Sequence, residues 1–230
     1  MLRQNLHNHT LYSDGSFLPE EIITAAISAQ IDLIGISDHF FTTKVYGNLS
    51  YQQWFDEFWH RYLYSLGQLK EYFAGQIRVA AGIEIDSALH RTVGAIERLP
   101  WSDINSALDY VLFEYVGESC IGGLPVEKIA EIRQHCTIPV FLVHSDLDYL
   151  ARKMPLEDFF NELRQNDIGF EIVAGKRNRW FWKQYDASLL EGVKLCIGSD
   201  THNDISEVAN LDLALNWLET NGLLEQLTDL

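Results

Sequence analysis

Histidines of this sequence gather where short apolar runs end. Five of its eight histidines stand there, and carboxylate residues accompany them. Imidazole nitrogens suit zinc, iron and manganese, and carboxylates bridge and neutralise adjacent cations in metal clusters. The pattern therefore predicts metal chemistry carried by His7, His9, Asp14, His39, Glu84, His144, Asp200 and His202.

Two of these groups repeat one spacing. In His7-x-His9 the alternation of a strand sends both side chains to the same face, so that both can reach one ion. Asp200-x-His202 repeats the arrangement. One such pair is a weak signal, but two pairs with further ligand-type residues between them form a strong one.

Short apolar runs alternate with helical stretches along the chain. Strands are predicted at 5–7, 33–36, 77–85, 110–113, 140–143, 168–173 and 194–197. Helices are predicted at 19–30, 51–73, 126–135, 156–166, 187–191 and 206–221. This order is typical of parallel β/α units.

No glycine-rich nucleotide-binding motif follows the first strand, and no P-loop motif is present. A closed or nearly closed α/β barrel is therefore favoured. Such barrels carry their chemistry at the carboxyl ends of the strands, where the candidate ligands stand.

Length and composition narrow the function further. A chain of 230 residues with no internal linker predicts a single domain. Its formal net charge of −16 argues against an extended nucleic-acid partner. Three cysteines at no ligand spacing, no signal-like segment and no membrane-length apolar run indicate a cytoplasmic protein that does not enter membranes.

The order of motifs resembles the PHP (polymerase and histidinol phosphatase) superfamily of metal-dependent phosphoesterases, in particular its histidinol-phosphatase-like members. The resemblance rests on HNHTLYSDG, LIGISDH, GIEID, DYVL, FLVHSD, FEIV and GSDTH. It implies one PHP domain over residues 1–230, folded as a distorted seven-stranded TIM-like barrel. It also implies a cluster of two or three divalent ions of zinc, manganese or iron.

Ligand roles follow from the same resemblance. His7, His9, Glu84 and Asp200 resemble the ligands of one part of the cluster. Asp14, His39, His144 and His202 resemble the ligands of the rest of the cluster, and Glu84 resembles a bridge between the two parts.

One motif departs from the family pattern. The fourth strand of the family ends in a ligand histidine, and Val116 stands at that position here. Glu114, two residues earlier, is a candidate replacement ligand because a carboxylate binds the same metals. The alternative is that Glu114 points to solvent or pairs with a base.

Basic residues near the predicted site are few. Lys176, Arg177 and Arg179 follow the sixth predicted strand and are candidates for binding a substrate phosphate. Arg177 is similar in placement to an arginine that histidinol-phosphatase-like members use on the phosphate. Lys44 is a weaker candidate for the same role.

These features predict hydrolysis of a small phosphate monoester by a metal-bridging hydroxide. Asp200, His202 and His39 are candidates for the catalytic proton transfer. Two alternatives stay open: cleavage of phosphodiesters in a short nucleic acid, and a non-catalytic module that metal ions stabilise. The sequence leaves the substrate and the oligomeric state open.

Overall fold

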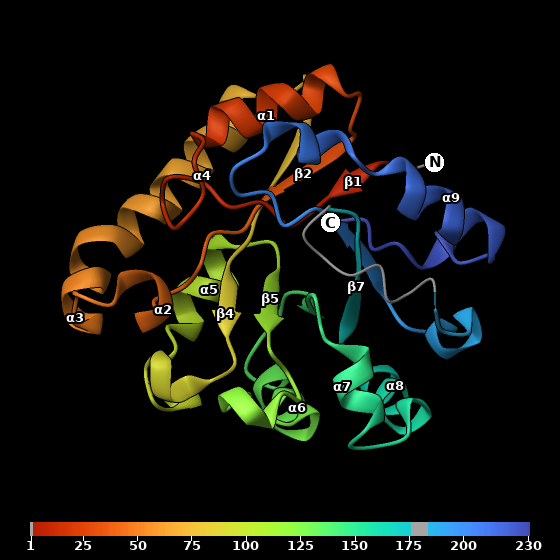
Figure 1. The fold of residues 1–230 in the computed structure, drawn as a ribbon. Coiled ribbons are helices and arrows are strands. Elements are labelled where there is room, and N and C mark those ends of the chain that lie inside the picture. The colour runs from red at the N-terminus through yellow and green to blue at the C-terminus, as the bar shows by residue number, and fades with distance from the viewer. Residues whose placement is uncertain (1, 176–183) are drawn as a thin grey trace.

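Strands and helices alternate through most of the chain (Figure 1). A computed structural model describes residues 2–175 and 184–230. The strands are β1 (Gln4–Asn5), β2 (Leu33–Ile36), β3 (Arg78–Ala81), β4 (Glu84–Asp86), β5 (Val111–Glu114), β6 (Val140–Leu142), β7 (Gly169–Val173) and β8 (Leu195–Gly198). The helices are α1 (Pro19–Ser28), α2 (Thr43–Tyr46), α3 (Tyr51–Trp54), α4 (His60–Tyr72), α5 (Trp101–Ala107), α6 (Val126–Arg133), α7 (Leu147–Ala151), α8 (Leu156–Gln165) and α9 (Asp212–Thr220).

The strands form two parallel sheets that meet at both edges. The first sheet has the order β1-β2-β3, and the second runs β4-β5-β6-β7-β8. On one side the Leu6 amide donates to the Ile197 carbonyl at 2.8 Å, which joins the extension of β1 to β8. On the other side the Phe40 amide donates to the Glu84 carbonyl at 2.7 Å. Because Phe40 follows β2, this second bond joins the extension of the central strand of the first sheet to β4. The predicted α/β class is confirmed, and the two connections are consistent with a barrel.

The predicted strand 77–85 is divided into β3 and β4. Gly82 and Ile83 separate the two parts, so that β3 pairs with β2 while β4 pairs with β5. A glycine is required at the break, because a side chain at Gly82 would overlap the Tyr110 ring. The Tyr110 hydroxyl donates to the Leu6 carbonyl at 2.5 Å. The described residues therefore contain eight short strands where seven were predicted.

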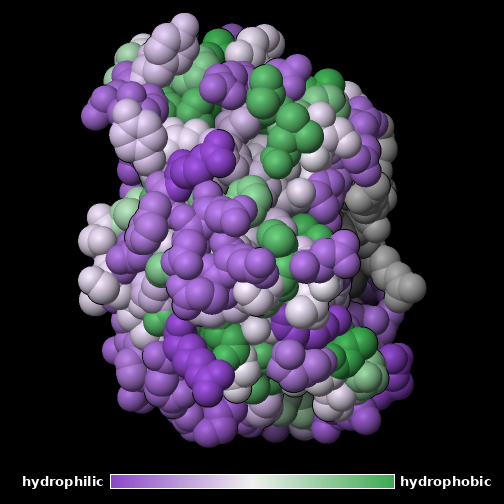
Figure 2. Space-filling view, turned by 90° about the vertical axis from the view of Figure 1, so that its left-hand side faces the viewer, coloured by the Kyte–Doolittle hydropathy of each residue, from purple (hydrophilic) through white to green (hydrophobic). Residues whose placement is uncertain are grey.

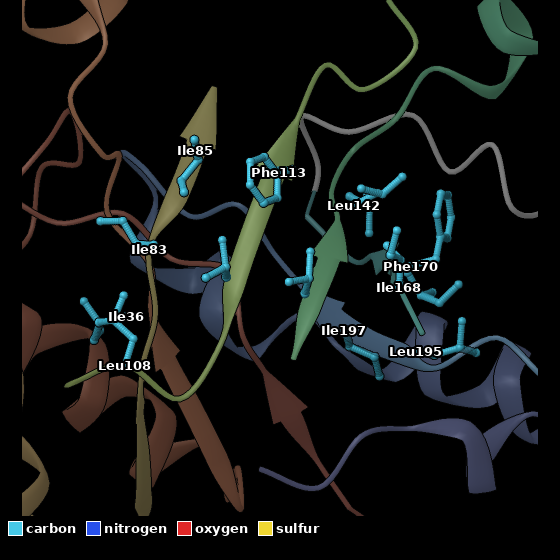
Figure 3. Close-up of a cluster of buried hydrophobic side chains, with 14 of the residues drawn as sticks. Ile36, Ile83, Ile85, Leu108, Phe113, Leu142, Ile168, Phe170, Leu195 and Ile197 are labelled. Carbon is cyan, nitrogen blue, oxygen red and sulfur yellow. The ribbon is translucent and has the colours of Figure 1, made fainter. Parts of the chain in front are cut away.

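Alternation along the strands separates two apolar cores. Val111 and Phe113 of β5 point outward, whereas Leu112 between them points inward. The outer core, part of which Figure 3 shows, packs strands against helices. The inner core contains buried residues of both sheets and none of the helices: Leu6, Leu33, Ala80, Tyr110, Leu112, Phe141, Val143 and Cys196. These side chains fill the interior of the barrel below the candidate site.

The aromatic stretch predicted as one helix over 51–73 has three parts. A π-helical turn, Phe55–Trp59, lies between α3 and α4. Trp54, Trp59 and Tyr62 are buried, so the aromatic stripe is core packing as expected. The predicted helices 187–191 and 206–221 also differ, because the first is a 3₁₀ turn and the second begins as one before α9.

The surface in Figure 2 is mostly hydrophilic, with hydrophobic residues in small groups. Among the described residues, the helices are too short or too polar to span a membrane.

Candidate metal centre

The nine residues predicted as ligands lie together at one end of the barrel. A pocket of about 300 Å³ is lined there by Asp14, His39, Lys44, Glu84, Glu114, Tyr115, His144, Asp200 and His202. His7 and His9 are buried beside it, within 3.5 Å of Glu84 and Asp200. The predicted ligands come from strands β4 and β5 and from the segments after β1, β2, β6 and β8, because the carboxyl ends of parallel strands meet at one end of a barrel.

Glu84 lies at the centre of the group. Its Oε1 is 3.0 Å from His144 Nε2 and 3.4 Å from His7 Nε2. Its Oε2 is 2.9 Å from His39 Nδ1 and 3.3 Å from His9 Nε2. A buried carboxylate that faces four imidazoles has the geometry of a bridge between cations.

Asp14 forms a second focus at the pocket entrance. Its Oδ1 lies 3.3 Å from His202 Nε2 and 3.7 Å from both His9 Nδ1 and His39 Nε2. These four residues lie close enough together to hold one ion. Three further sets have the same property: His7, His9 and Asp200; His7, Glu84 and His144; and His39, Glu84 and Glu114.

Glu171 orients His7 from below. This β7 carboxylate is fully buried, lies 2.8 Å from His7 Nδ1 and accepts the His144 backbone N–H at 2.9 Å. The carboxylate places a proton on His7 Nδ1, so the Nε2 lone pair of neutral His7 is directed at the centre. Carboxylates hold metal-ligating histidines in this way. The sequence interpretation did not select Glu171, although a carboxylate between Phe170 and Ile172 in an apolar strand is a usable signal.

Gly198 makes room for this contact. A Cβ atom at this position would overlap Glu171 Oε1 and the Cβ of His7. The glycine is therefore required by close approach, and the strand conformation itself is ordinary.

His202 is oriented in the same manner. Its Nδ1 lies 2.9 Å from the Asp200 carbonyl oxygen, which can only accept a hydrogen bond. Nδ1 therefore carries the proton, and the Nε2 lone pair of neutral His202 faces Asp14. Two histidines whose tautomers are set for ligation, together with the buried carboxylates, fit divalent metal ions.

Three residues at the pocket have the left-handed backbone conformation. Tyr115, His144 and Asp200 have φ values of 63°, 32° and 53° and follow β5, β6 and β8. For residues other than glycine this conformation costs on the order of 1–3 kcal/mol each. The left-handed conformation turns the chain sharply after each strand and brings these side chains to the pocket.

Charges within the site shift the pKa values in opposite directions. Burial raises the pKa of Glu84, but His39 and His7 outweigh burial and hold it well below its usual range. Burial lowers the pKa of His144, but its hydrogen bond to Glu84 raises it to about 9. Burial and the neighbouring His39 lower the pKa of His9 to about 3. Without metal, the centre is therefore an ion-pair network of carboxylates and protonated histidines around a neutral His9.

This network predicts how the stability of metal-free protein depends on pH. The pKa of His144 is raised from 6.5 to about 9 on folding, so its contribution is fully present below pH 6.5. The contribution is lost as the pH rises through about 9. We expect the melting temperature of chelated protein to fall by several degrees, roughly, between pH 6.5 and 9.5.

Thermal melts of chelated and metal-loaded protein over this pH range check the expectation. The loaded protein is the control, because metal ions replace the protons and should flatten the dependence. A melting temperature of the chelated protein that stays constant or rises above pH 6.5 would contradict it.

Glu114 faces the pocket and pairs with a base. Its side chain is buried, and Lys44 Nζ donates to Oε1 at 2.7 Å and to Oε2 at 2.8 Å. The pairing with a base is therefore confirmed, and the role of Glu114 as a metal ligand stays a prediction. Exposure of Glu114 to solvent, one part of the second alternative, is wrong.

Comparison with known proteins places the chain in a family. A profile of the PHP domain matches residues 5–168, which is more than half of the chain. The chain belongs to the PHP domain family. No curated protein sequence is significantly similar to this PHP domain protein.

Two solved structures resemble this PHP domain protein in fold. Histidinol phosphate phosphatase of Lactococcus lactis, in complex with zinc, L-histidinol and phosphate, is 18% identical with a TM-score of 0.62. The match covers 96% of this chain and 94% of that one. A proposed histidinol phosphatase of Listeria monocytogenes is 13% identical with a TM-score of 0.61, and the match covers 89% and 97% of the two chains.

The departure from the family motif is structural as well. Val116, which stands where the family has a histidine, is fully buried in the outer apolar core. Val116 does not line the pocket, whereas Glu114 and Tyr115 of the same segment do.

The basic loop predicted to bind phosphate lies outside the described residues. This holds for Lys176, Arg177 and Arg179, whose substrate role stays a prediction. Lys44 does line the pocket, although the sequence ranked it lower.

Proposed function

We propose that this PHP domain protein is a metal-dependent phosphoesterase that hydrolyses small phosphate monoesters. The observation that carries the proposal is the convergence of His7, His9, His39 and His144 on the buried Glu84 carboxylate, beside an open pocket. A protein has little reason to bury so many ionisable groups together unless cations bind among them.

The proposed ligands are His7, His9, Glu84 and Asp200 on one side and Asp14, His39, His144 and His202 on the other. Divalent ions bound there would activate water as a nucleophile and neutralise charge on the phosphoryl oxygens. Zinc, manganese and iron all suit these ligands. The zinc held by the Lactococcus protein supports zinc as the first ion to test.

The remaining chemistry belongs to the protein side chains. Burial raises the pKa of Asp200, but His7 and His9 outweigh burial and hold it well below its usual range. Asp200 is therefore ionised and suited to bind a cation, whereas its low pKa makes it a weak proton acceptor. His39 and His202 are the other candidates for proton transfer, but a metal-bound histidine is a poor proton donor, so ligation and proton donation to the leaving alkoxide are alternative roles for each of them.

Pocket size supports a small substrate. A volume of about 300 Å³ is at the lower end of small-molecule sites, which supports a small substrate over an extended nucleic-acid strand. The phosphate and L-histidinol in the Lactococcus structure support a small phosphorylated compound as substrate here too.

A metal-resolved activity screen tests the proposal. Protein stripped by chelation and reloaded with zinc, manganese or iron would be assayed for phosphate release from a panel of phosphomonoesters that includes histidinol phosphate. We expect release from at least one monoester, its loss on chelation and its return with metal.

A diester of the same alcohol is the matched control. Faster cleavage of the diester than of the monoester would favour a phosphodiesterase instead. No release from any ester by protein shown to contain metal would favour a non-catalytic module.

A further inference from the structure

A lysine and a glutamate share a buried corner of the centre. Lys44 Nζ bonds both oxygens of Glu114, whose side chain is 1% exposed, while the lysine side chain is 29% exposed. Glu114 Oε1 is 3.8 Å from His39 Nδ1, and Oε2 is 3.9 Å from His144 Nε2. The ammonium group is therefore a positive charge built into the ligand cluster.

Neighbouring groups hold this lysine in place. Thr42 caps the short helix that carries Lys44 and accepts its backbone N–H at 3.3 Å. The Thr42 hydroxyl donates to Asp86 at 3.2 Å, and Arg91 binds the same carboxylate at 2.9 Å. Lys44 also lies over the Tyr115 ring, with Nζ 5.1 Å from its centre. These contacts order a side chain that would otherwise be flexible.

The available donor atoms support two metal ions. Neutral histidine ligates through one nitrogen, and Nδ1 of His7 is already bound to Glu171. The two candidate sets that share His7 therefore describe a single ion. A second ion fits Asp14 and His202, which lie in one candidate set with His9 and His39. A third would need Glu114 with Glu84 and His39 Nδ1, and both oxygens of Glu114 already accept from Lys44.

We propose that the Lys44 ammonium group takes the place of one cation of the centre, which then binds two metal ions per chain. The inference rests on the proposed metal centre. Lys44 has three N–H donors, and Glu114 accepts two of them. Lys44 also lines the pocket, so a phosphoryl group bound there would lie near its positive charge.

Counting metal ions by elemental analysis of zinc-saturated, dialysed protein tests the inference. We expect two ions per chain in the wild type. Lys44→Met should bind three, because Glu114 is then a free buried carboxylate beside Glu84 and His39. The double variant with Lys44→Met and Glu114→Gln should return to two.

Lys70→Met is the matched control. Lys70 Nζ bonds both oxygens of Asp109 at 2.9 and 2.8 Å, at the opposite end of β5 from the centre. Its loss should leave the count at two. Glu114→Gln in the wild-type background gives an independent measure if Lys44→Met fails to fold, and should also leave two ions.

Four results of the metal count would contradict the inference or the metal centre on which it rests. Three ions in the wild type, two in folded Lys44→Met, or one in Glu114→Gln would overturn the role of Lys44. No bound zinc in the wild type would overturn the proposed metal centre itself, and with it the function.

Discussion

Glu84→Gln is expected to reduce the proposed phosphoesterase activity by more than about 100-fold and to remove tightly bound metal. Replacing groups that only orient metal ligands typically costs 10–100-fold, and Glu84 lies within 3.4 Å of four imidazoles. Glutamine keeps the shape but loses the negative charge that binds cations. Metal content and kcat/KM, measured on the same preparation, check this prediction.

Glu225→Gln is a suitable control for Glu84→Gln, because Glu225 is exposed and lies outside the pocket. A Glu84→Gln protein that retains its full metal content and activity would exclude Glu84 as a bridge between ions.

Glu171→Gln is expected to weaken metal binding by about 10–100-fold, even though Glu171 itself reaches no ion. The glutamine NH₂ can donate to His7 Nδ1, which would move the ring proton to Nε2. If the amide oxygen faces Nδ1 instead, the negative charge that orients the ring is still lost. Either change withdraws the His7 lone pair from the centre. Competition against a zinc-binding dye would measure the affinity.

The exposed Glu191 supplies the control variant Glu191→Gln. Far-ultraviolet circular dichroism would show whether Glu171→Gln remains folded. A folded Glu171→Gln protein with wild-type zinc affinity would show that His7 needs no carboxylate partner.

Several features of the fold could be read from local pattern. Apolar runs of strand length and helical spacing located most elements within a few residues. The break at Gly82 could not be predicted, because the Tyr110 ring that lies against it comes from a distant segment just before β5. The π-helical turn at Phe55–Trp59 could not be predicted either, because aromatic residues at helical spacing fit a continuous α-helix equally well.

The partner of Glu114 in the site could not be predicted from local pattern either. Its position beside a missing histidine left ligation and pairing with a base equally open. The outcome depends on Lys44, which lies 70 residues away in the sequence and reaches Glu114 across the pocket. No local pattern reports a contact of that kind.

By itself, the sequence determined which residue types stand at the strand ends, and hence the metal-binding character of the centre. Two-residue alternation and parallel topology place such residues at one end of a barrel whatever their distance in sequence. Only the tertiary structure decided their partners: Glu171 beneath His7, 164 residues away, and Lys44 on Glu114. Side chains from different strands meet according to how the strands pair and pack, which the spacing of residues along the chain does not encode.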